Sequence, residues 1–157
     1  MNEFSVPMFQ LRVSMRLTDG RTLAGDVFLP AHSPVRDGPM LAGEWANLAP
    51  AFIPVRQSSG EGVVMIAHRH VVDIALPPGV AAVAPDTLVD APVRRVSVET
   101  AGGPALTGRL AIALPAPRQR VGDWLNNSEA YLTLEVDGSF HLVQKAHIVT
   151  VTELDGE

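Results

Sequence analysis

The most constraining feature of this chain is that it repeats itself. The sequence Gly-Glu-Trp-Ala-Asn at residues 43–47 returns as Gly-Asp-Trp-Leu-Asn at residues 122–126, and these two blocks contain both Trp residues of the chain. Five further blocks return in the same order: 12–14 with 95–97, 23–25 with 106–108, 29–31 with 114–116, 52–55 with 131–134, and 70–74 with 147–151. The repetition predicts one folding unit used twice, over residues 1–76 and 93–157. Residues 77–92, rich in Pro, Ala and Val, are the expected linker.

The first part of each copy has the pattern of a bent strand pair. Residues 11–17 alternate apolar and polar side chains, which is the period of a half-buried strand. Asp19 and Gly20 supply a turn, and residues 22–29 form the returning strand with Gly25 inside it. Gly108 stands at the matching point of the second copy. A glycine within a strand permits the sharp bend that a small barrel needs.

The rest of each copy completes a β unit. A polar loop follows, with one helical turn at the Trp, and Asp123 is the expected N-cap of that turn. Three more strands come next, at 131–136, 139–144 and 148–154 in the second copy, with a tight 3₁₀ corner at Lys145–His147. We therefore expect an all-β fold made of two tandem five-stranded small barrels of the SH3-like type. Each barrel is expected to carry a short helical turn in an enlarged loop.

This pattern resembles the Sm-like barrel, a family that includes bacterial Hfq. The resemblance lies in the strands bent at glycine, 23–27 and 106–110, and in the run Leu-Val-Gln-Lys-Ala-His-Ile-Val-Thr-Val at 142–151 with its match at 65–74. It covers most of both copies and implies two Sm-like barrels whose strand edges pair between subunits. The tandem with its Asp/Glu-Trp-x-Asn element also resembles a bacterial domain family of unknown function, which implies no known activity.

The resemblance also implies an RNA-binding surface. In Sm-type rings the corner before the last strand contacts nucleotide, which here points to Lys145, His147, His68, Arg69 and His70. The charge balance opposes this interpretation, because 17 Asp and Glu outnumber 12 Lys and Arg and give a net charge of -5. RNA binding is therefore the alternative hypothesis, and a solvated polar corner is the simpler interpretation of these residues.

The two Trp-x-Asn elements have two interpretations. Each Trp ring can cover the open end of its own barrel, which is the simpler account of a large apolar side chain. Alternatively, Trp45, Asn47, Trp124 and Asn126 contact a ligand or a partner. The sequence favours the packing role.

The residue pattern gives no support to an enzyme or a metalloprotein. The chain has no Cys, which excludes disulfides and thiolate metal sites. His68 and His70 would share a face of an extended segment, but two ligands do not make a zinc site. The sequence contains neither a phosphate-binding glycine loop nor a nucleophile elbow, and Asp123 near Glu129 is better explained by helix capping. We expect no catalytic residue, no metal and no cofactor.

The chain also lacks signals for export or membrane insertion. Its N-terminus has no basic start followed by an apolar stretch. The longest uncharged apolar stretch, residues 74–85, contains three Pro and is shorter than the ~20 residues that span a bilayer. A cytoplasmic protein without membrane association is expected.

Self-association is the function class that fits best. Apolar residues make up 46% of the chain and charged residues 18%, which suits a protein that buries more surface than a small unit can bury alone. Small barrels leave strand edges that can pair between subunits, and residues 63–67 and 139–144 are the candidate edges. The leading hypothesis is a non-enzymatic module that oligomerises or binds a protein partner.

Overall fold

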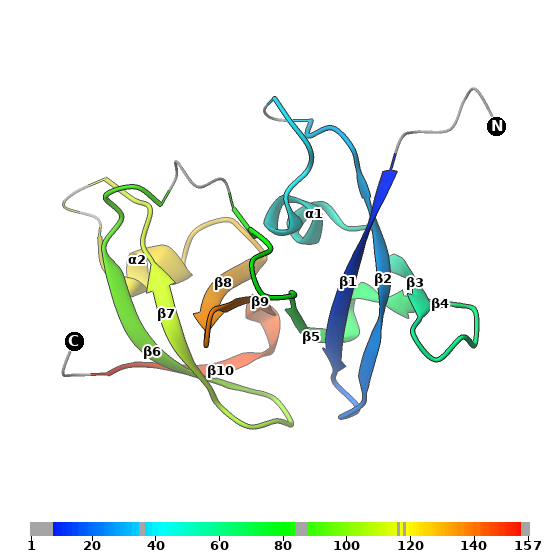
Figure 1. Ribbon diagram of the computed structural model, residues 1–157. Coiled ribbons are helices and arrows are strands. Elements are labelled where there is room, and N and C mark those ends of the chain that lie inside the picture. The colour runs from blue at the N-terminus through cyan, green and yellow to red at the C-terminus, as the bar shows by residue number, and fades with distance from the viewer. Residues whose placement is uncertain (1–7, 35–36, 84–87, 116, 118, 155–157) are drawn as a thin grey trace.

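The protein is described by a computed structural model that covers residues 8–34, 37–83, 88–115, 117 and 119–154 (Figure 1). Within these residues the chain is all-β, with ten strands in one antiparallel sheet and two short α-helices. The first half contains β1 (Met8–Leu17), β2 (Thr22–Pro30), α1 (Ala42–Leu48), β3 (Phe52–Gln57), β4 (Val63–Ala67), the 3₁₀ turn η1 (His68–His70) and β5 (Val71–Ala75). The second half contains β6 (Val93–Thr100), β7 (Leu106–Ala111), α2 (Val121–Leu125), β8 (Tyr131–Val136), β9 (Ser139–Gln144), the 3₁₀ turn η3 (Lys145–His147) and β10 (Ile148–Glu153).

The helical turn at each Trp and the 3₁₀ corner before each last strand are found where the sequence predicts them. One detail of the prediction is wrong. The N-cap of α2 is Arg120, and Asp123 lies inside the first turn of that helix. A carboxylate in the first turn still interacts favourably with the helix dipole, which explains why an acidic residue suits this position.

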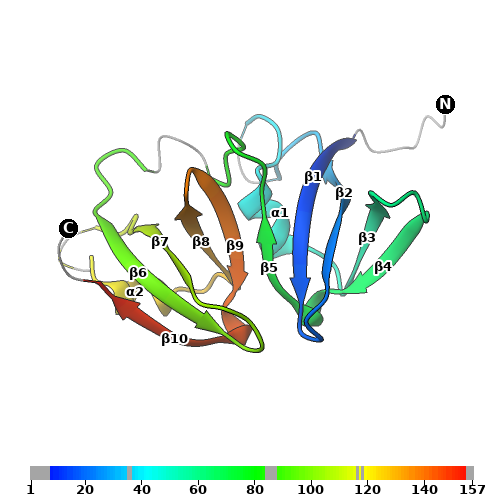
Figure 2. The ribbon, with the colours of Figure 1, turned by 60° about the horizontal axis from the view of Figure 1, so that its bottom comes forward.

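Strand pairing follows the same order in both halves. The sheet runs β10-β6-β7-β8-β9-β5-β1-β2-β3-β4, so the first half is ordered β5-β1-β2-β3-β4 and the second β10-β6-β7-β8-β9. The two halves do not form two separate sheets, because β5 of the first half pairs with β9 of the second. Figure 2 shows β9, β5 and β1 side by side where the halves meet. The result is a single open sheet, and a closed barrel in each half stays a prediction.

Two apolar clusters form the core, and they do not divide strictly by half. The first contains the inward-facing residues of β1, β2 and β3 together with Trp45. It also contains Tyr131 and Leu142, which come from β8 and β9 of the second half. The second cluster is built on β6, β7 and β8, with Val143 added from β9. Residues of β9 therefore pack into both clusters and bind the halves together.

Gly25 and Gly108 occupy matching and equally crowded positions. A Cβ at Gly25 would collide with the carbonyl oxygen of Arg56 on β3, and a Cβ at Gly108 would collide with that of Glu135 on β8. Both strands therefore pass so close to the next strand that only glycine fits. The structure thus gives each glycine a reason in close strand packing, and the bend expected at these positions stays a prediction.

Candidate interaction surfaces at the strand edges

The junction between the halves is a short antiparallel pairing of β5 with β9. Its register places Asp73 opposite Val143, Ile74 opposite Leu142 and Ala75 opposite His141. The amide of Leu76 also donates a hydrogen bond to the carbonyl oxygen of Phe140, at a distance of 2.9 Å that is typical of a sheet. This bond extends the pairing of β5 with β9. The junction therefore uses ordinary sheet hydrogen bonds to join two units that have the same strand order.

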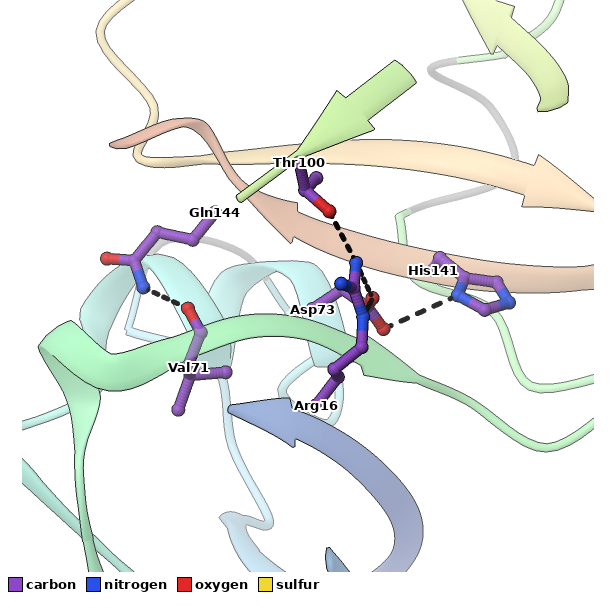
Figure 3. A network of polar contacts seen from close by, with 6 residues as sticks. All are labelled: Arg16, Val71, Asp73, Thr100, His141 and Gln144. Carbon is purple, nitrogen blue, oxygen red and sulfur yellow. Dashed lines mark hydrogen bonds and ion pairs between the residues drawn. The ribbon is translucent and has the colours of Figure 1, made fainter. Parts of the chain in front are cut away.

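Buried charges cross this junction (Figure 3). The Arg16 guanidinium on β1 donates from Nε to Asp73 Oδ2 at 3.0 Å and from Nη2 to Thr100 Oγ1 of the second half at 2.6 Å. On the other side of Asp73, Nδ1 of His141 lies 3.6 Å from Oδ1. Asp73 is only 5% exposed, so its charge depends on these neighbours. Because the partners come from both halves, the network ties the halves in one arrangement.

Two side-chain amides make further hydrogen bonds between the halves. Asn47 in α1 accepts hydrogen bonds at Oδ1 from the backbone amides of Ala130 and Tyr131, at 2.8 and 3.0 Å, and donates from Nδ2 to the carbonyl oxygen of Gly43. Gln144 donates from Nε2 to the carbonyl oxygen of Val71 at 2.5 Å (Figure 3). Asn47 thus contacts the second half of the same chain, and the interpretation of this residue as a contact for a ligand or partner stays a prediction.

The two 3₁₀ corners meet at the same junction. The His68 ring stacks on Tyr131 with centroids 5.5 Å apart, and its Nε2 lies 2.7 Å from the Tyr131 hydroxyl. His147 donates from Nε2 to the carbonyl oxygen of Arg69 at 2.6 Å. Burial lowers the pKa of His68 and raises the pKa of the Tyr131 hydroxyl, since each charged form would lose hydration. The structure therefore brings the two predicted corners side by side.

Most polar side chains of the RNA-binding hypothesis have structural contacts there. His70 shares a 2.9 Å hydrogen bond with the Thr18 hydroxyl, and Lys145 donates from Nζ to Asn127 Oδ1 at 2.6 Å. The Arg69 side chain is exposed. His68 and His70 contact different partners, so the shared face expected from their spacing does not form a common ligand set.

The two Trp residues both pack against the apolar clusters, but to different depths. Trp45 is 6% exposed and belongs to the first apolar cluster, and Trp124 is half-buried and packs against the second. Asn126 repeats the inner contact of Asn47, since its Nδ2 donates to the carbonyl oxygen of Gly122 at 2.9 Å. Within the described chain, however, Asn126 Oδ1 has no hydrogen-bond donor like those that Asn47 receives.

Among the strands of the described residues, β4 and β10 form the two unpaired edges of the sheet. The sequence predicted edge pairing for residues 63–67, which form β4, and for residues 139–144. The second prediction is wrong. Residues 139–144 form β9, which pairs with β5 within the chain and so has no free edge. The remaining free edge of the second half is β10, which sequence alone did not single out.

Counterpart residues at the junction and at the free edges differ sharply in exposure. Leu142 on β9 is fully buried, whereas its counterpart Met65 on β4 is 57% exposed. Val72 on β5 is fully buried, whereas its counterpart Val149 on β10 is 67% exposed. Apolar positions that the junction covers are thus open to solvent at both ends of the sheet. Exposed apolar residues on unpaired strand edges mark surfaces that can pair with another strand.

The polar part of the junction has little signature in the sequence. Arg16, Asp73 and His141 were not singled out, because charged residues at alternating positions of a strand normally face solvent. One sequence feature that could have pointed to these polar residues is that the two copies differ at their positions. Asp73 is matched by Thr150, and Arg16 by Glu99, in positions that are otherwise similar.

Within the described residues, no helix has the length and apolar character needed to cross a membrane. Comparisons of the chain with models of protein families, with curated proteins and with solved structures found no match in any of the three.

Proposed function

We propose that this protein is a non-enzymatic interaction module that associates with further copies of itself, head to tail, through β10 of one copy and β4 of the next. In this proposal each half is a small Sm-like barrel unit, and the contact between copies repeats the contact between β5 and β9 inside the chain. The supporting observation is that apolar residues buried at the inner junction have exposed counterparts on both free edges.

The inner junction also supplies the register of the proposed contact. Transferring its three residue pairs to their counterparts places Thr150 opposite Ile66, Val151 opposite Met65, and Thr152 opposite Val64 of the next copy. This register covers Met65 and Val149, and gives the unpaired backbone groups of both edges hydrogen-bond partners.

A second contact follows from the Trp-x-Asn elements. Asn47 Oδ1 accepts from the amides of Ala130 and Tyr131, whose counterparts are Ala51 and Phe52. In the proposed assembly Asn126 Oδ1 accepts from these two amides of the next copy. Phe52 is 50% exposed, whereas its counterpart Tyr131 is 2% exposed, so this region also gains apolar burial.

RNA binding at the corners has less support. Four of the five side chains named for it, those of His68, His70, Lys145 and His147, are engaged in hydrogen bonds within the chain. Titration of labelled A-rich or U-rich RNA at two salt concentrations tests this alternative, since phosphate contacts make affinity strongly salt-dependent. Salt-sensitive submicromolar binding would favour RNA, and no binding at low salt would remove it.

Cysteine cross-linking tests the proposed assembly directly, because the natural chain contains no Cys. The double variant Thr152→Cys with Val64→Cys is expected to form disulfides between copies, giving a ladder of covalent oligomers on a non-reducing gel. The matched variant Ala75→Cys with His141→Cys probes the inner register and should cross-link within one chain. A slipped pair, Thr152→Cys with Val63→Cys, should cross-link poorly because neighbouring residues point to opposite faces.

Light scattering supplies the independent measurement. We expect a mass above the 16.7 kDa of one chain, rising with concentration. A protein that stays monomeric at all concentrations, or a slipped pair that cross-links as well as the aligned pair, contradicts the proposal.

A further inference from the structure

The two halves differ at the centre of their outer faces. In the first half, Arg12 on β1 lies opposite Asp26 on β2, and its Nε donates to Asp26 Oδ1 at 2.7 Å. In the second half, the counterpart positions on β6 and β7 hold Arg95 and Arg109, also directly opposite one another. An arginine–carboxylate pair in one half is therefore replaced by two arginines in the other.

Two arginines that face each other on neighbouring strands repel one another. Side chains directly opposite on antiparallel strands have Cβ atoms about 5 Å apart, and like charges at that spacing repel. Both arginines are exposed, and across the described chain neither guanidinium has an ion pair or an intramolecular hydrogen bond. Glu135 lies opposite Arg109 on β8, but no ion pair joins them. The donors of both guanidinium groups are therefore free for a ligand.

The two arginines line one groove on the described surface. This groove has a volume of about 630 Å³. Its lining consists of Arg95, Thr107, Gly108, Arg109, Glu135, Asp137 and Gly138. Two cationic groups and a hydroxyl thus share one groove with two carboxylates.

We propose that this groove binds a small oxyanion, a carboxylate or a phosphate group, between Arg95 and Arg109. The bound oxyanion takes the place that the Asp26 carboxylate holds in the first half, where Arg12 lowers the pKa of that carboxyl by a direct hydrogen bond. Guanidinium groups bind planar carboxylates and phosphates with paired hydrogen bonds, which makes two facing arginines a suitable receptor.

The acidic residues narrow the ligand class. Glu135 and Asp137 would repel the successive phosphates of a nucleic acid, so the groove favours a ligand with one oxyanion. The same carboxylates accept hydrogen bonds from an amine or hydroxyl on the ligand. A small molecule that carries an oxyanion and an amine therefore fits better than a simple anion. The site does not depend on self-association.

Titration followed by NMR of the arginine Nε–Hε signals tests the site on the full chain. The probes are inorganic phosphate, acetate and phosphoethanolamine, each compared with chloride at matched ionic strength. We expect saturable shifts at Arg95 and Arg109 with phosphate or acetate, and the tighter of the two identifies the preferred oxyanion. Phosphoethanolamine should bind more tightly than phosphate, and Glu135→Gln should remove that advantage.

The first half supplies the decisive variants. Arg109→Asp installs the arrangement of Arg12 with Asp26 and is expected to fold normally, while weakening oxyanion binding about tenfold or more. Arg12→Gln, at the counterpart of Arg95, should leave binding unchanged. The absence of saturable shifts in the natural chain, or equal binding by Arg109→Asp, would overturn the proposal.

Discussion

Leu142 and Met65 hold matching positions in the fourth strand of each half, but Leu142 is fully buried and Met65 is 57% exposed. The difference arises because β9 has β5 on its outer side, whereas β4, paired with β3 on its inner side, has no described strand on its outer side. Two strands with matching sequence positions thus differ in pairing, since β9 is paired on both sides and β4 on one side only. The predictions on assembly follow from this relationship.

Met65→Lys should abolish self-association and leave the folded monomer intact. A charge on the exposed edge must be desolvated when another strand pairs with it, and lysine is a common device against edge pairing. Because Met65 is exposed, the free energy of unfolding should change by no more than about 0.5 kcal/mol. Light scattering and urea unfolding measure the two effects. Met8→Lys, at an exposed position on β1, is the matched control and should leave the mass unchanged.

Two proline variants should separate the outer and inner edges of β10. The amide of Leu154 donates to Arg95 of β6, so by alternation the Thr152 amide also faces β6 and the Glu153 amide faces outward. Glu153→Pro removes an outward donor and should weaken self-association. Thr152→Pro removes an inner sheet bond and should destabilise the monomer by about 3 kcal/mol or more. Equal loss of stability in both variants would contradict this assignment of the edge.

Asp73→Ala should destabilise the protein strongly, because it leaves the Arg16 guanidinium buried without its carboxylate. Removal of one partner of a buried ion pair costs about 3 to 5 kcal/mol, and the partial exposure of Arg16 places the expected loss near the lower end. Asp26→Ala removes an arginine–aspartate pair at a solvent-exposed position and should destabilise the protein far less. Urea unfolding of both variants checks the contrast.

Stability should depend on pH through His68. Burial lowers the pKa of this residue below the 6.5 of a free imidazole, so the unfolded chain binds the proton more readily than the folded chain. The contribution is fully present above pH 6.5 and is lost as the pH falls toward the lowered pKa. His68→Gln should flatten that part of the curve. The measurement is urea unfolding between pH 7.5 and pH 5.5, and an unchanged slope in the variant would exclude His68 as the source.

Gly108→Ala should disturb the second half of the sheet. Its Cβ would meet the backbone of β8, so the strands must separate, at a cost of about 1 to 3 kcal/mol. Gly122→Ala places a Cβ in open space within α2 and should be neutral or slightly stabilising. Thermal unfolding of both variants is the measurement, and a stable Gly108→Ala protein would show that the close approach is not required.

Much of the fold could be predicted from local pattern. Alternation predicted β1, the glycine positions marked the points where β2 and β7 pass close to the next strand, and the repeated blocks indicated halves with the same strand order. These features depend on neighbours within one strand or turn. The N-cap of α2 was mispredicted because cap position depends on where the chain enters the helix, which Arg120 rather than Asp123 decides.

The pairing between halves could not be predicted, because two similar copies offer similar edges. What distinguishes them are a few substitutions, such as Asp73 against Thr150 and Leu76 against Glu153. Leu76 is buried at the junction, whereas Glu153 is exposed on β10. These substitutions indicate which edge is paired only when the residues that contact each position are known, and those residues lie far away in sequence.

The two unpaired edges of the sheet are different strands, β4 and β10. A two-fold dimer pairs each edge with the same edge of the second copy, so it cannot use the proposed register, which pairs β10 with β4. In the proposed assembly each added copy would offer the same unpaired edge again, and growth would stop only when the last β10 reached the first β4. The rotation from one half to the next would then be the one seen between the two halves of a single chain. The size of such a closed ring would be encoded within one molecule, and the ring would contain an even number of halves.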